Sequence, residues 1–160
     1  MIYFICICFI IACAALQHIT HELSHVLAAV ICREKVTRIQ WLTYNGGTKV
    51  FFQNEPDFDT APIAKKWAFI SAAGFIGTNI LAYIFTVVFL LVPSGYVKLF
   101  FLIAAGIFLI TDSAHFLLAV VFDFGDAYGL KRTLKCSKGI LMLTAILNVL
   151  INIILFMYIF

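Results

Sequence analysis

The feature that most restricts the fold of this chain is a series of four long apolar segments, at residues 2–32, 67–92, 98–122 and 139–160. A helix needs about 20 mainly apolar residues to cross the hydrocarbon core of a bilayer, and each segment is long enough. Of the 160 residues, 64% are hydrophobic and 12% are charged, values far from those of a soluble domain. The sequence predicts an all-α membrane protein, with residues 1–160 forming one polytopic domain of four transmembrane helices.

A short β-hairpin is expected between the first and second segments, over about residues 36–53. Residues 36–44 and 48–53 are rich in β-branched and aromatic side chains and flank the sequence Asn45-Gly46-Gly47. Asn-Gly is a strong signal for a hairpin turn, because both central residues of a type I′ turn need positive φ. Two roles fit the hairpin: a structural loop at the membrane interface, or an edge that pairs with an extended substrate segment.

The distribution of basic residues predicts the orientation in the bilayer. Ten of the eleven Lys and Arg residues follow the first or third segment, namely Arg33, Lys35, Arg38, Lys49, Lys65, Lys66, Lys131, Arg132, Lys135 and Lys138. Only Lys98 falls on the other side. By the positive-inside rule, both long loops lie in the cytoplasm and both termini lie outside. The net charge of +3 reflects this topology and gives no support to nucleic-acid binding.

The first apolar segment contains the sequence His21-Glu22-Leu23-Ser24-His25. Residues four apart lie on one face of a helix, so His21 and His25 can bind one Zn²⁺ while Glu22 acts as general base. A structural histidine pair is the alternative. Ionisable groups at membrane depth cost on the order of 2.5 to 3.5 kcal/mol each, so clustering these residues with His18 favours a metal site.

A catalytic zinc usually has three protein ligands and one open position, so a further ligand is needed. Asp126 is the preferred candidate because it follows Gly125, where the helix can break, and because the third segment delivers it to the side toward which His25 points. Asp123, His115 and Asp112 are the alternatives, and the last two could instead orient a histidine ring or form a helix-packing pair.

His18 shares the face of the two motif histidines. It lies seven residues from His25, roughly 10 Å along the helix axis, which is too far for both to bind one ion. We expect His18 to contact the ligands indirectly or to line a water path, with simple burial against a polar partner as the alternative.

In their order along the chain, these features resemble the site-2 protease family of intramembrane zinc metalloproteases. The resemblance includes the histidine motif, the β-rich loop, the stretch Ala73-Gly74-Phe75-Ile76-Gly77-Thr78-Asn79, and a third span leading to an aspartate. The family's Gly-Pro-x-x-Asn and Leu-Asp-Gly patterns are altered here, with Phe75 in place of the proline and no glycine after Asp126. The resemblance implies one Zn²⁺ per chain and a substrate-holding role for Asn79, for which an interhelical hydrogen bond is the alternative.

The sequence thus predicts an intramembrane zinc metalloprotease that hydrolyses a peptide bond in or near a transmembrane segment of a membrane-protein substrate. One alternative is a non-proteolytic zinc-binding membrane adaptor or chaperone, which a closed site of four protein ligands would favour. Another is a metal-dependent hydrolase of a lipid-like substrate, which turnover of such a compound without any peptide product would favour.

Overall fold

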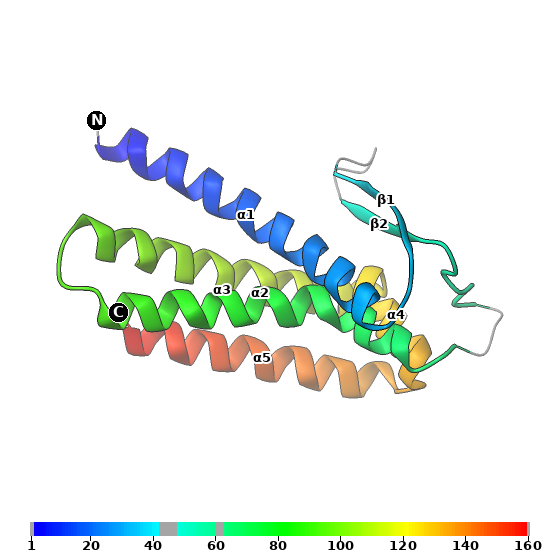
Figure 1. Ribbon diagram of the computed structural model, residues 1–160. Helices are drawn as coiled ribbons and strands as arrows, with labels where there is room; N and C mark the ends of the chain where they lie inside the picture. Colours follow the sequence, from blue (N-terminus) through cyan, green and yellow to red (C-terminus); the bar gives the residue numbers. More distant parts are fainter. Residues whose placement is uncertain (1, 42–47, 60–62, 160) are drawn as a thin grey trace.

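The computed structural model describes residues 2–41, 48–59 and 63–159 and is mostly helical (Figure 1). Four helices are long and apolar enough to cross a membrane: α1 (Ile2–Ile31), α2 (Lys66–Leu91), α3 (Tyr96–Phe122) and α5 (Lys138–Ile159). Each begins and ends within two residues of a predicted segment. The predicted fold class is confirmed, and the chain is a multi-pass membrane protein.

A short turn at Pro93-Ser94-Gly95 makes α2 and α3 antiparallel neighbours. Helix α2 ends at Leu91, and the next residue, Val92, has the extended backbone favoured before a proline. Gly95 then begins α3 with φ of 142°, a conformation that favours glycine over residues with a side chain. The turn therefore sets α2 directly against α3.

Helix α3 packs against α1, α2 and α5, and small side chains allow the close approach. Ala82 of α2 and Ala105 of α3 are almost fully buried. A Cβ atom added at Gly106 would lie 3.0 Å from the ring of Phe156, so α3 and α5 also meet at close range. These contacts leave α3 at the centre of the helix arrangement.

The predicted hairpin is present between α1 and α2. Strands β1 (Val36–Gln40) and β2 (Lys49–Phe52) pair in an antiparallel manner, with Ile39 opposite Val50 and Gln40 opposite Lys49. Both strands are shorter than the predicted stretches. The expected turn at Asn45-Gly46-Gly47 lies outside the described residues.

A short helix, α4 (Gly125–Leu134), follows α3 and is not predicted from the sequence. Its 10 residues are too few to cross a bilayer, and Lys131 and Arg132 interrupt any apolar run. One face is nevertheless apolar, since Ala127 and Leu130 are buried. Helix α4 therefore packs against the bundle instead of continuing α3.

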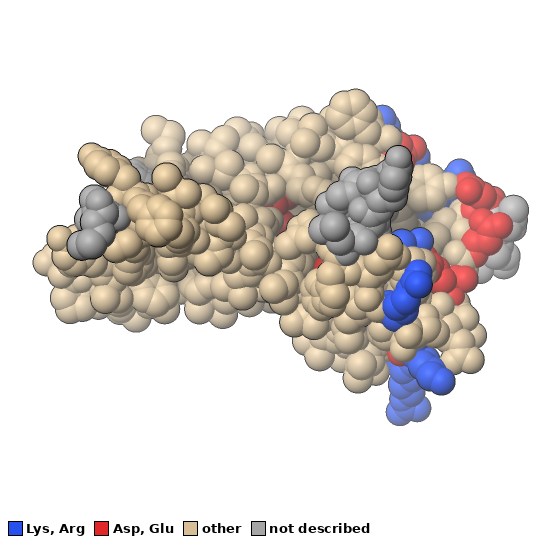
Figure 2. Space-filling view, turned by 90° about the horizontal axis from the view of Figure 1, so that it is seen from above, with Lys and Arg blue, Asp and Glu red and all other residues tan. Residues whose placement is uncertain are grey.

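The two ends of the bundle differ in character. Both termini and the α2–α3 turn lie at one end, whereas the hairpin and α4 lie at the other (Figure 1). On the face drawn in Figure 2, most of the charged side chains gather at the end with the hairpin, and few are visible elsewhere. Glu34, just after α1, binds Lys66 at the start of α2 and accepts a hydrogen bond from Asn54. This charged end anchors the loop that follows the hairpin.

Candidate metal centre

His21 and His25 lie on one face of α1, with their ring centroids 5.0 Å apart. Oδ2 of Asp126, from α4, lies 3.0 Å from Nε2 of His21 and 3.3 Å from Nε2 of His25. Within the described part of the chain, these three residues form a group that could hold a metal ion, with ligand atoms within 4.8 Å of one another. The structure thus brings together the two motif histidines and the preferred third ligand.

The break in the helix between α3 and α4 explains why Asp126, and not Asp123, reaches the histidines. Asp123 follows α3 with φ of 60°, and Gly125, the first residue of α4, has φ of 56°, so two left-handed residues redirect the backbone between the two helices. Asp126 then falls in the first turn of α4. The carboxylate of Asp123 instead forms an ion pair with Lys131.

The hydrogen bonding of His25 fixes which ring nitrogen can bind a cation. Its Nδ1 lies 2.6 Å from the carbonyl oxygen of Ile70, and because a carbonyl can only accept, Nδ1 donates. In the neutral ring, Nε2 then carries the lone pair and points at Asp126. Nδ1 of His21 likewise faces an acceptor, Oδ1 of Asp112, at 3.7 Å. Both Nε2 atoms are therefore oriented as metal ligands.

These orientations place two nitrogen lone pairs against an acidic oxygen. Burial raises the pKa of the Asp126 carboxyl, whereas hydrogen bonds donated by protonated His21 and His25 lower it below its ordinary value. The group requires positive charge at its centre, from two imidazolium rings side by side or from one cation. A single metal ion would satisfy all three ligand atoms at once.

The donor set and the available space fit Zn²⁺. With zinc–ligand bonds of about 2.0–2.2 Å, neighbouring ligand atoms of a tetrahedral site lie roughly 3.4 Å apart, close to the separations of Asp126 from the histidines. Gly74 of α2 leaves room at this point, because an added Cβ would lie 2.5 Å from Nε2 of His21 and 2.6 Å from Nε2 of His25. Two histidines and a carboxylate also suit other divalent metals, so the geometry is compatible with zinc without being specific to it.

Asp112 contacts His21 from the side opposite Asp126. Its side chain is 2% exposed, and Oδ2 accepts a hydrogen bond of 2.9 Å from Nδ2 of Asn79. A carboxylate that faces the second nitrogen of a ligating histidine fixes the orientation of the ring. This placement corresponds to the orienting role considered for Asp112, and not to a ligand within the group of three.

A chain of polar side chains continues from Asp112 through the bundle. Asn152 of α5 donates to Oδ1 of Asn79 at 3.1 Å and to Oγ of Ser113 at 2.6 Å, and Asn148 also donates to Ser113. Asn79 itself is buried. Its amide thus joins α2 to α3 and α5, which is the interhelical bonding considered for it; its contact with substrate stays a prediction.

Glu22 is buried beside the metal group and lines a cavity of about 850 Å³. The same cavity is lined by the three predicted ligands and by residues of α2, α3, α4 and the hairpin. A carboxylate in this position has access both to the metal group and to the space next to it. The arrangement can activate a small molecule held in the cavity.

His18 and His115 line the cavity but are not part of the metal-binding group found among the described residues. The ring of His115 is centred 6.0 Å from the ring of His21. His18 is exposed one turn before the motif, in keeping with a position beside the site instead of in it.

Three residues of the site are absent from the sequence predictions, namely Ile70 on α2 and Asn148 and Asn152 on α5, and the contact of Gly74 with the histidines is likewise not predicted. Gly74 belongs to the stretch that resembles the family, but its contact with both histidines depends on how α1 crosses α2. The two asparagines carry a signal, since polar side chains four residues apart in an apolar span indicate one helix face that contacts another helix.

Comparison of the chain with protein-family models, with curated proteins and with solved structures finds no match. The fold and the site define a multi-pass membrane protein with a group of two histidines and one aspartate that could hold a metal ion.

Proposed function

We propose that the chain is an intramembrane zinc metalloprotease of the site-2 protease type, which cleaves a membrane-protein substrate in or near a transmembrane segment. The observation that carries the proposal is the convergence of His21, His25 and Asp126 beside Glu22 in one cavity. Three ligands from α1 and α4 would hold the ion and leave a position toward the cavity.

Each group of the chain has a defined task in this proposal. Zinc, when bound, supplies Lewis-acid activation of water and of the scissile carbonyl. Glu22 accepts the proton of the attacking water and returns it to the leaving amine. Ile70 and Asp112 keep the two imidazole rings in the orientation that directs Nε2 toward the centre.

The cavity extends from the metal group to the hairpin, which suits an extended peptide. Lys49, Val50 and Phe52 of β2 line it, and β2 is the second strand of a two-stranded sheet within the described residues. A transmembrane helix hides its carbonyl groups in internal hydrogen bonds, so a substrate must unwind before cleavage, and the free edge of β2 can pair with the unwound segment. We place this end of the bundle in the cytoplasm because of its basic loops.

The main alternative is a zinc-binding adaptor or chaperone, for which a closed site of four protein ligands is expected. The described residues supply a group of three ligands, and His115, which could serve as a fourth ligand in a closed site, stands outside it. The large cavity beside the group also favours a site that admits water and substrate.

The test is the Glu22→Gln variant, reconstituted with zinc beside the unchanged chain and a membrane-spanning peptide. We expect equal zinc content in both proteins and cleavage by the unchanged chain only, because glutamine cannot accept the proton. Equal cleavage by the two proteins would refute the role of Glu22. Cleavage of lipid with intact peptide would favour the lipid-hydrolase alternative.

A further inference from the structure

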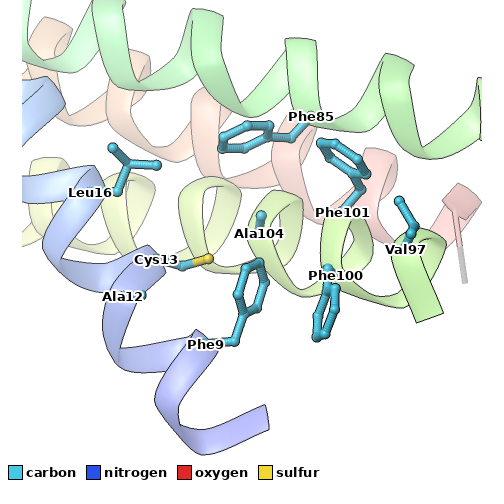
Figure 3. A pocket seen from close by; sticks show the side chains of 9 residues that line it. All are labelled: Phe9, Ala12, Cys13, Leu16, Phe85, Val97, Phe100, Phe101 and Ala104. Atoms are coloured by element: carbon cyan, nitrogen blue, oxygen red, sulfur yellow. The ribbon is translucent and has the colours of Figure 1, made fainter. Parts of the chain in front are cut away.

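A second pocket, of about 390 Å³, lies between the first half of α1, the start of α3, and α2 (Figure 3). Its nine lining side chains carry no charge, and the thiol of Cys13 is their one polar group. They include the rings of Phe9, Phe85, Phe100 and Phe101 beside the small side chains of Ala12 and Ala104 (Figure 3). Small side chains and aromatic rings thus share the lining, which leaves room for one bulky apolar side chain.

The two pockets are neighbours along the same pair of helices. On α1, Leu16 lines the apolar pocket and the next residue, Gln17, lines the cavity with the metal group. On α3, Ala104 lines the first and Thr111 the second. Thr111 donates to Gln17 at 2.8 Å, so the hydrogen bond between α1 and α3 marks the boundary. A single segment lying along α1 and α3 would contact both pockets.

We propose that the apolar pocket binds a bulky apolar side chain of the substrate's own membrane segment and so selects where that segment is cut. The inference rests on the proposed function, because the second point of attachment is the metal cavity. A free lipid chain would fill the apolar pocket alone, whereas the position of the two pockets next to each other along α1 and α3 fits a peptide that contacts both. The pocket would then act as a specificity site.

The spacing between the pockets predicts the position of the selected side chain. Cys13 and His21 are eight residues apart on α1, or roughly 12 Å along the axis. A substrate covers this distance with about four residues if extended, at about 3.3 Å each, or about eight if helical. The bulky residue is therefore expected about four to eight residues from the scissile bond, on the side toward the termini of this chain.

Filling the pocket tests this specificity. The full chain is reconstituted in phosphatidylcholine vesicles with a series of membrane-spanning peptides built of Leu and Ala. Each peptide contains one Asn-Gly pair as the intended cleavage site and a single Phe, which is moved to successive positions along the series. Ala12→Phe puts an aromatic ring into the pocket from α1, and Ala14→Phe is the matched control, since Ala14 is exposed on α1 and outside the pocket. We expect Ala12→Phe to lower cleavage of the preferred peptide about tenfold, the scale of losing one apolar contact site, and Ala14→Phe to leave it unchanged.

Cross-linking tests occupancy without relying on cleavage. Cys13 is kept while Cys6, Cys8, Cys32 and Cys136 are replaced by alanine, and the peptide carries one cysteine in place of its Phe. With copper phenanthroline added as oxidant, we expect disulfide formation at Cys13, strongest when the peptide cysteine stands four to eight residues from the Asn-Gly pair. A chain with Cys13→Ala and Ala14→Cys is the control and should cross-link weakly at every peptide position.

The two readouts separate the two proposals. Selective cross-linking at Cys13 without cleavage by the unchanged chain would support peptide binding in the pocket and count against the protease. If Ala12→Phe cleaves the preferred peptide as fast as the unchanged chain, and if cross-linking at positions 13 and 14 is equal, the protease is supported and the role of the pocket is overturned. Cross-linking at neither position would likewise overturn it, as expected if lipid fills the pocket.

Discussion

Nδ1 of His25 lies 2.6 Å from the carbonyl oxygen of Ile70, so the backbone of α2 sets the orientation of a side chain on α1. One helical turn later on α2, Gly74 lies next to Nε2 of the same ring. Helix α2 therefore positions the histidine with a carbonyl group and leaves space at its other nitrogen by lacking a side chain. This relationship makes Gly74 as important to the candidate site as a ligand.

Gly74→Ala is expected to abolish metal binding. Its Cβ would lie 2.5 Å from Nε2 of His21 and 2.6 Å from Nε2 of His25, closer than real Cβ contacts. Zinc content of the purified protein is the measurement. Gly139→Ala is the control, because its Cβ would meet only Oγ of Ser137 at an ordinary 3.7 Å. Full zinc content in Gly74→Ala would contradict the placement of the site.

Replacement of single carboxylates and of His115 tests the ligand set. Asp126→Asn should lose zinc, because an amide oxygen is a neutral and weaker ligand than the carboxylate. Two variants should keep their zinc. One is Asp123→Asn, which changes a carboxylate that forms an ion pair with Lys131, and the other is His115→Ala. Zinc lost from the His115→Ala protein alone would require a different third ligand.

Asp112→Asn tests the orientation of His21. The amide keeps the shape of the side chain but removes the charge that faces Nδ1, and we expect a loss of about 10- to 100-fold in zinc affinity or activity. Titration with zinc in a competing chelator measures the change. An affinity equal to that of the unchanged chain would show that Asp112 acts only in helix packing.

The predictable part of this fold is the part determined by local composition. Length and hydropathy predict the four spans, because each must cover the same bilayer thickness. Charge distribution predicts that Asp126 and the histidine motif lie toward the same end. Helix α4 is not predicted, because its boundaries depend on two residues with left-handed backbone, Asp123 and Gly125, and on burial against the rest of the helix bundle. The contacts of Ile70 and Gly74 depend on how two helices cross, which no local pattern contains.

Asn152→Leu tests the polar chain between α2, α3 and α5. Asn152 is 2% exposed and bonds to Asn79 and Ser113, so its loss leaves buried partners unsatisfied. We expect the free energy of unfolding to fall by about 0.6 to 1.7 kcal/mol, the range for hydrogen bonds between membrane helices. Asn148→Leu, which removes one bond to Ser113, should cost less. Steric-trap unfolding in detergent measures both, and an equal loss would contradict the central place of Asn152.

The contact between Glu34 and Lys66 predicts an acid-sensitive anchor. The hydrogen bond from Lys66 lowers the pKa of Glu34 below its ordinary value of 4.5 in the folded chain. Its stabilisation is therefore present above pH 4.5 and is lost as the pH falls through the lower folded pKa. The melting temperature is measured from about pH 6 to about pH 2, the range in which carboxylates titrate. It should fall less steeply with decreasing pH in Glu34→Gln than in the unchanged chain. Glu55→Gln, at a longer 4.0 Å contact with Lys49, is the control and should keep the original slope.

Diffraction from the zinc-loaded protein at energies on either side of the zinc absorption edge tests the central claim most directly. We predict one anomalous peak, from an ion bound by Nε2 of His21, Nε2 of His25 and Oδ2 of Asp126, with the remaining position open to the cavity beside Glu22. A peak closed by four protein ligands, or one located away from these three residues, would contradict it.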